Sequence, residues 1–122
     1  MRVLSTLLIV IVALLHTGFM GLEMFLWSTP EGQRIFGMTP EVSALTAVLA
    51  ANQGLYNGFI AAGLLWSAFS GRRDLRIFFL VCVVMAGLFG AMSAKPSILF
   101  LQALPGALAL AAVLATGPRT EE

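Results

Sequence analysis

Two ionisable residues, His16 and Glu23, interrupt a long apolar segment near the N-terminus. The segment covers residues 3–27 and reads VLSTLLIVIVALLHTGFMGLEMFLW. A carboxyl group inside such a segment is costly without a polar partner or water, so it indicates a functional site. His16 and Glu23 are seven residues apart, which is about two helical turns, so both side chains leave the same face of a helix. An imidazole and a carboxyl group on one face could bind a polar ligand or act as acid and base.

A second polar cluster lies in the next apolar segment, within LAANQGLYNGF. Its amides and phenol need hydrogen-bond partners from neighbouring helices, water or a ligand. Counting about 1.5 Å per residue from the outer ends places Asn52 and His16 at about 16–17 Å depth. The same count places Glu23 and Gln102 at about 7–8 Å. We therefore predict a pocket that opens outward and has a shallow and a deep polar layer.

The predicted ligand-binding residues come from three apolar segments: His16, Glu23, Asn52, Gln53, Tyr56, Asn57 and Gln102. Each also has a purely structural interpretation. A single histidine is often a satisfied interior residue, and amides between helices often serve only to join them. Glu23 could pair with Lys95 or Arg34 near the outer surface. Small residues at Ala50, Gly54, Gly58 and Ala62 recur every four positions, which favours close helix contact.

The composition is that of a membrane protein. Of the 122 residues, 59% are hydrophobic and only 11% are charged, and the mean hydropathy is +0.95. Soluble domains carry about 25% charged residues. Four apolar runs, at about 3–27, 42–69, 77–94 and 98–115, predict a single all-α domain over residues 1–122, an antiparallel bundle of four transmembrane helices. We interpret the first run as a retained helix, because no small-residue cleavage site follows it.

The lysines and arginines predict the topology. With the N-terminus inside, five fall on the cytoplasmic side (Arg2, Arg72, Arg73, Arg76 and Arg119) and two on the other side (Arg34 and Lys95). This bias places both termini in the cytoplasm. We therefore expect a multi-pass protein of the bacterial inner membrane whose partners are the lipid bilayer, a small or lipid-like ligand and a second copy of the chain. A net charge of +1 gives no reason to expect nucleic acid.

Several blocks of the sequence resemble one bacterial membrane family. They are LEMFLW at 22–27, then TPEGQRIFGM, LAANQGLYNGFIAAGLLW at 49–66 and LPG at 104–106. The family is catalogued as a domain of unknown function, number thirteen hundred and four. The resemblance covers nearly the whole chain and implies a small four-span integral membrane protein. These blocks contain Glu23 and the polar residues of the second segment, but the family brings no assigned activity.

Three functions remain open. The first is binding or transport of a small or lipid-like molecule in an outward-facing pocket around Glu23. The second is a structural or assembly role beside another membrane protein, with the polar residues joining helices. The third is a membrane enzyme that uses Glu23 and His16 as an acid–base pair. No nucleophile motif or metal-ligand set supports this third function, and we expect neither a metal nor a cofactor. Cys82, the only cysteine, excludes an internal disulfide.

Overall fold

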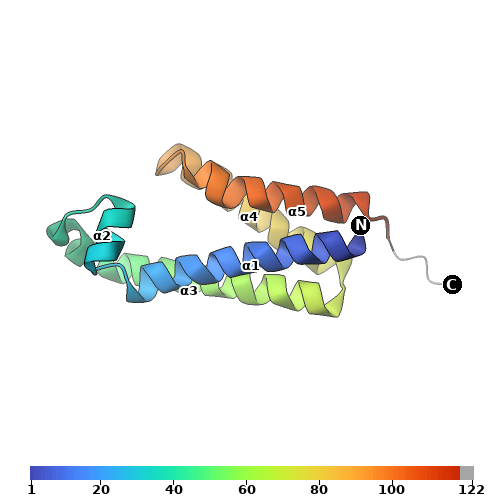
Figure 1. The fold of residues 1–122 in the computed structure, drawn as a ribbon, viewed down its shortest axis with the longest axis horizontal. Helices are drawn as coiled ribbons and strands as arrows, with labels where there is room; N and C mark the ends of the chain where they lie inside the picture. The colour runs from blue at the N-terminus through green and yellow to red at the C-terminus, as the bar shows by residue number, and fades with distance from the viewer. Residues whose placement is uncertain (119–122) are drawn as a thin grey trace. The chain divides into compact units, whose positions relative to one another are not determined.

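The computed structural model describes residues 1–118, which form five α-helices and one π-helical turn and contain no β-strand (Figure 1). The elements follow in the order α1 (Arg2–Phe25), α2 (Pro30–Phe36), α3 (Pro40–Ser70), α4 (Arg73–Ser93), η1 (Leu99–Ala103) and α5 (Leu104–Ala115). The predicted all-helical class is confirmed. Arg119, which the topology count includes, lies outside the described residues.

The helix bounds agree with three of the four predicted runs to within a few residues. The exception is α4, which begins at Arg73 rather than at 77 because the charged stretch before the apolar run is also helical. Among the described residues, α1 and α4 are long and apolar enough to cross a membrane, whereas Leu99–Ala115 is a shorter apolar helix. The amides of LAANQGLYNGF lower the hydropathy of α3. Four spans therefore stay a prediction.

The tripeptide Thr-Pro-Glu occurs twice, at the start of α2 and at the start of α3. Thr29-Pro30-Glu31 begins α2, and Thr39-Pro40-Glu41 begins α3. The Thr29 hydroxyl accepts a hydrogen bond from the Gly32 N–H at 3.2 Å, and the Thr39 hydroxyl accepts one from the Val42 N–H at 3.3 Å. Threonine N-caps, prolines in the first turn and acidic first turns all favour helix initiation.

The last apolar run begins with a π-helical turn. The N–H of Leu104 donates to the carbonyl of Leu99, five residues earlier. Pro105 has no N–H, so it cannot donate to the carbonyl of Leu101 and disturbs the regular ladder at this point. The turn also widens the helix around Gln102 before α5 continues regularly.

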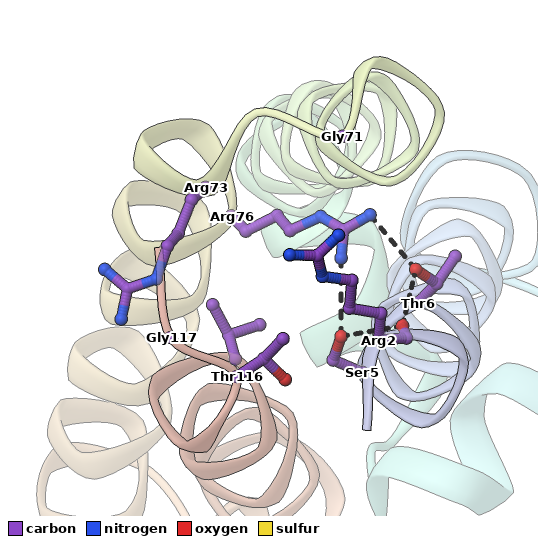
Figure 2. Close-up of a pocket in the computed structure, with 9 residues that line it drawn as sticks. Arg2, Ser5, Thr6, Gly71, Arg73, Arg76, Thr116 and Gly117 are labelled. Carbon is purple, nitrogen blue, oxygen red and sulfur yellow. Dashed lines mark hydrogen bonds between the residues drawn. The ribbon is translucent and has the colours of Figure 1, made fainter. Parts of the chain in front are cut away.

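The chain forms two compact units. The larger contains Met1–Leu15 and the chain from Ile60 onward; the smaller contains His16–Phe59. At one end of the larger unit, the guanidinium of Arg76 in α4 donates to the hydroxyls of Ser5 and Thr6 in α1, at 3.3 and 3.0 Å (Figure 2). The same guanidinium donates to the carbonyls of Ser67 and Ala68 at the end of α3. Arg76 thus ties three helices together.

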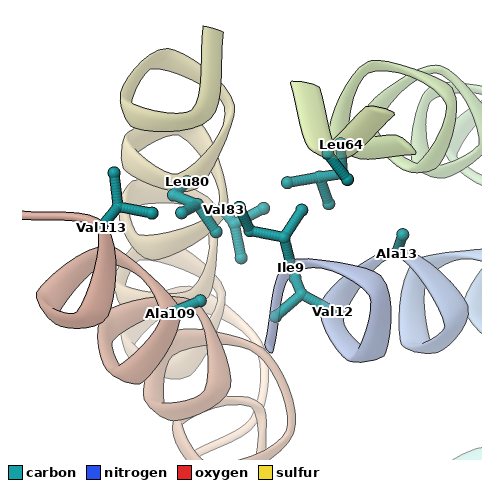
Figure 3. Close-up of a cluster of buried hydrophobic side chains, with 9 residues drawn as sticks. Ile9, Val12, Ala13, Leu64, Leu80, Val83, Ala109 and Val113 are labelled. Carbon is teal, nitrogen blue, oxygen red and sulfur yellow. The ribbon is translucent and has the colours of Figure 1, made fainter. Parts of the chain in front are cut away.

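The core of the larger unit draws on four helices (Figure 3). Its buried members are Ile9, Val12 and Ala13 of α1, Leu64 and Ala68 of α3, Leu80 and Val83 of α4, and Ala109 and Val113 of α5. Glycine permits a close contact between the backbones of α4 and η1: a Cβ added at Gly87 would lie 2.5 Å from the Ala103 backbone nitrogen. Four helices therefore share one core within this unit, and a four-helix bundle over the whole chain stays a prediction.

Candidate functional site

The buried face of α1 in the smaller unit carries both ionisable residues. His16 is 1% exposed and Glu23 is 7% exposed. The sequence prediction that they share one inward-facing side of the helix is confirmed. Thr17 and Gly18, on other faces of the same turn, are exposed.

The two oxygens of Glu23 have different environments. Oε1 accepts a hydrogen bond from the side-chain amide of Asn57 in α3, with Nδ2 and Oε1 3.0 Å apart. Oε2 is buried and has no hydrogen-bond partner among the described residues. The amide of Gln53 lies beside the same carboxyl group. Because the amide N–H of Asn57 can only donate, Oε1 is held as an acceptor, and any proton or ligand contact falls on Oε2.

Gly54 allows α3 to approach α1 at this site. A Cβ added there would lie 3.0 Å from the Cβ of Glu23 and 3.2 Å from the backbone oxygen of Met20. The small residues predicted to line a helix contact are thus partly confirmed. Ala50 and Gly54 are buried, and Gly58 faces the side chain of Met20, but Ala62 is exposed.

His16 and Glu23 do not form a direct acid–base pair. Seven residues along one helix correspond to about 10 Å, which is too far for a proton to pass directly. The imidazole instead packs edge-on against Phe19, with ring centroids 5.3 Å apart. Any proton transfer between the two groups would need intervening water or ligand.

The other predicted site residues differ in exposure and do not all lie in one unit. Asn52, Gln53 and Tyr56 are exposed, and Asn57 is partly buried. Gln102 is partly buried and lies in η1, which belongs to the larger unit. Within the smaller unit the structure therefore brings together Glu23, Asn57 and Gln53. The inward orientation expected for Asn52 is wrong for the chain as described.

Among residues 1–118, no group of three histidine, cysteine, aspartate or glutamate side chains could hold a metal ion. The sequence patterns do not reveal one cluster of charged side chains. Arg2, Arg73 and Arg76 enter the sequence analysis only through the topology, but in the structure they line one pocket of the larger unit. The sequence contains part of the information needed to find this cluster, because Arg73 and Arg76 are three residues apart and therefore share a helix face.

Comparison with known proteins settles the family. The family described as "Protein of unknown function (DUF1304)" matches residues 10–114. This chain belongs to that family. The "Uncharacterized protein YpaA" of Lactococcus lactis subsp. lactis (strain IL1403) is 32% identical over 120 residues, which is 95% of this chain and 98% of the relative. The resemblance noted from the sequence blocks is confirmed. No solved structure matches the chain.

Proposed function

We propose that this protein is a multi-pass membrane protein that binds, and in a transport cycle carries, a small or lipid-like molecule with a hydrogen-bond donor at its polar end. The proposal rests on one observation. The Oε2 atom of Glu23 is buried and has no hydrogen-bond partner among the described residues. A buried acceptor of this kind costs about 1–3 kcal/mol, and more when charged. An N–H or O–H group of a ligand, or a proton, would remove that cost.

Membrane placement is supported by the exposed apolar surface. Large hydrophobic side chains face outward on every long helix; examples are Leu14 at 63%, Leu45 at 83%, and Met92 at 82% exposed. Soluble monomers rarely expose continuous apolar patches above a few hundred Å². Lipid tails would cover these side chains without any protein partner. In that setting the carboxyl group of Glu23 lies within a helix whose residues are mostly apolar.

The neighbours of Glu23 fit a recognition role. Asn57 holds one carboxyl oxygen in place, and Gly54 brings the α3 backbone close to it. The exposed amide of Gln53 offers both a donor and an acceptor beside the carboxyl group. A hydroxyl or amine could reach Oε2 from that side while its apolar part lies along the exposed faces of the helices.

The test is native mass spectrometry of the protein released from detergent micelles or nanodiscs, together with identification of the small molecules that copurify. Glu23→Gln preserves the shape of the side chain but replaces one oxygen with an amide nitrogen that donates. We expect the wild type to retain a bound molecule and Glu23→Gln to lose most of it while keeping its helical content. Glu31→Gln, an exposed change in α2, is the matched control.

A molecule retained equally by wild type and Glu23→Gln would contradict the proposal. An assembly role is the second candidate, because Asn52 and Tyr56 are exposed on a helix whose surroundings would be apolar. Amides can both donate and accept across a helix pair. In the same spectra, a wild-type dimer without bound small molecule, lost in Asn52→Leu, would favour assembly.

A further inference from the structure

A pocket of about 290 Å³ lies at one end of the larger unit, where α1 begins, α3 passes into α4, and α5 ends. Its polar lining consists of three arginines and three hydroxyls: Arg2, Arg73, Arg76, Ser5, Thr6 and Thr116. These side chains come from α1, from α4 and from Thr116, the residue that follows α5 (Figure 2). None of the described residues that line the pocket is acidic. Glu23 belongs to the smaller unit and does not line this pocket, so a ligand bound here is additional to the one in the proposed function.

The positive charge of Arg76 has no acidic partner among the described residues. The Nε atom donates to the carbonyl of Ser67, and one terminal nitrogen donates to the hydroxyl of Thr6 and the carbonyl of Ala68. The other terminal nitrogen donates to the hydroxyl of Ser5. These four bonds leave one of the five guanidinium N–H groups for a ligand. All the acceptors are neutral, so the guanidinium is rigidly positioned and its charge is not compensated.

The hydroxyls have a fixed role in this arrangement. The Ser5 and Thr6 hydroxyls donate to the backbone carbonyl of Arg2, at 2.9 and 3.0 Å. They therefore offer lone pairs to Arg76, which can only donate. This network orients the first turn of α1 and holds Arg76 toward the pocket before any ligand arrives. Preorganised donors of this kind lose little freedom when an anion binds.

Arg73 contributes a second uncompensated charge. Its Nε atom is buried and has no hydrogen-bond partner among the described residues. Asp74, the next residue, is paired with Arg72, with Nη2 and Oδ2 2.6 Å apart. That acidic side chain is therefore engaged outside the pocket. Arg73 is also the first residue of α4, where the helix dipole adds partial positive charge.

We propose that this pocket binds a phosphate group. Guanidinium groups bind phosphate oxygens through paired, charge-assisted hydrogen bonds, and Arg2, Arg73 and the free N–H of Arg76 supply such donors around one space. The pocket volume of about 290 Å³ is just below the roughly 300–1,000 Å³ found for small-molecule sites, so it suits a head group rather than a large ligand. The phosphate could belong to a lipid head group in the adjacent leaflet or to a soluble phosphate ester.

The test uses the full-length protein and two probes. In detergent micelles, inorganic phosphate is titrated against sodium chloride at equal ionic strength while thermal unfolding is followed. In nanodiscs, phosphatidylglycerol in a phosphatidylcholine bilayer is compared with phosphatidylcholine alone, and retained lipid is counted by native mass spectrometry. The pocket variant is Arg2→Gln with Arg73→Gln, because neither side chain holds the described fold through a hydrogen bond. The control, Arg34→Gln with Lys95→Gln, removes the same charge from two exposed side chains elsewhere.

We expect at least one probe to bind the wild type and the control, and to bind the pocket variant about tenfold or more weakly. Binding of inorganic phosphate assigns the site to a soluble phosphate. Selective retention of phosphatidylglycerol alone assigns it to a lipid head group. The proposal is overturned if neither probe distinguishes the pocket variant from the control. If the test of Glu23 finds no bound ligand, the phosphate test of the arginine pocket still stands, because the two sites are tested with different variants.

Discussion

Glu23 is bound to the protein through only one of its oxygens. Asn57 donates to Oε1, whereas Oε2 is buried and unpartnered among the described residues. A side chain kept only to join α1 to α3 would be expected to satisfy both oxygens, since each unmet acceptor costs stability. At the scale of this one residue, the difference between the two oxygens therefore supports the proposal that the carboxyl group binds an external group.

Asn57→Leu tests the hydrogen bond that Asn57 donates to Glu23. Removing the amide takes away the donor that Oε1 has in the structure, so we expect the free energy of unfolding in mixed detergent micelles to fall by about 1–3 kcal/mol. Asn52→Leu is the matched control: the side chain is exposed, and we expect a change within about 0.5 kcal/mol. Equal effects of the two substitutions would mean that the Asn57–Glu23 bond does not stabilise the fold.

At the scale of the elements, close helix contacts depend on single glycines. The contact between α4 and η1 leaves no room for a Cβ at Gly87, because the atoms it would meet belong to the backbone of Ala103. Backbone cannot move aside as a flexible side chain can. The space at Gly58 is limited only by the side chain of Met20, so that position is more tolerant.

Gly87→Ala should therefore destabilise the protein by about 1–3 kcal/mol through overpacking. Gly21→Ala is the control, because nothing lies within 4 Å of the added Cβ, and alanine should raise helix stability by about 0.5–1 kcal/mol. The measurement is thermal unfolding in detergent, followed by circular dichroism. A Gly87→Ala variant as stable as the wild type would show that the α4–η1 contact is looser than described.

The sequence predicted helix type and most helix bounds, because Thr-Pro-Glu starts and apolar runs are local signals. It predicted less of the site. Depth counting gives the height of a residue along a helix but not its direction around the axis. Asn52 is two residues before Gly54, about 200° around α3, and so points away from α1 when Gly54 faces it. The gathering of Arg2 with Arg73 and Arg76 depends on tertiary packing, which no local pattern contains.

At the scale of the whole molecule, the proposed function requires the chain to cross a membrane. Helix α1 has 24 residues, about 36 Å in length, which would be enough to cross the hydrocarbon core of a bilayer. The start of α1, and with it the arginine pocket, would then face the cytoplasm. The Lys and Arg bias supports this orientation.

Cysteine labelling in whole cells tests this membrane-crossing topology most directly. Arg34→Cys and Arg72→Cys are made separately in a Cys82→Ser background and treated with a membrane-impermeant maleimide. We expect Arg34→Cys to react in cells whose inner membrane is intact, and Arg72→Cys to react only after that membrane is permeabilised. Equal reaction of both variants from outside, or recovery of the protein in the soluble fraction, would contradict the topology.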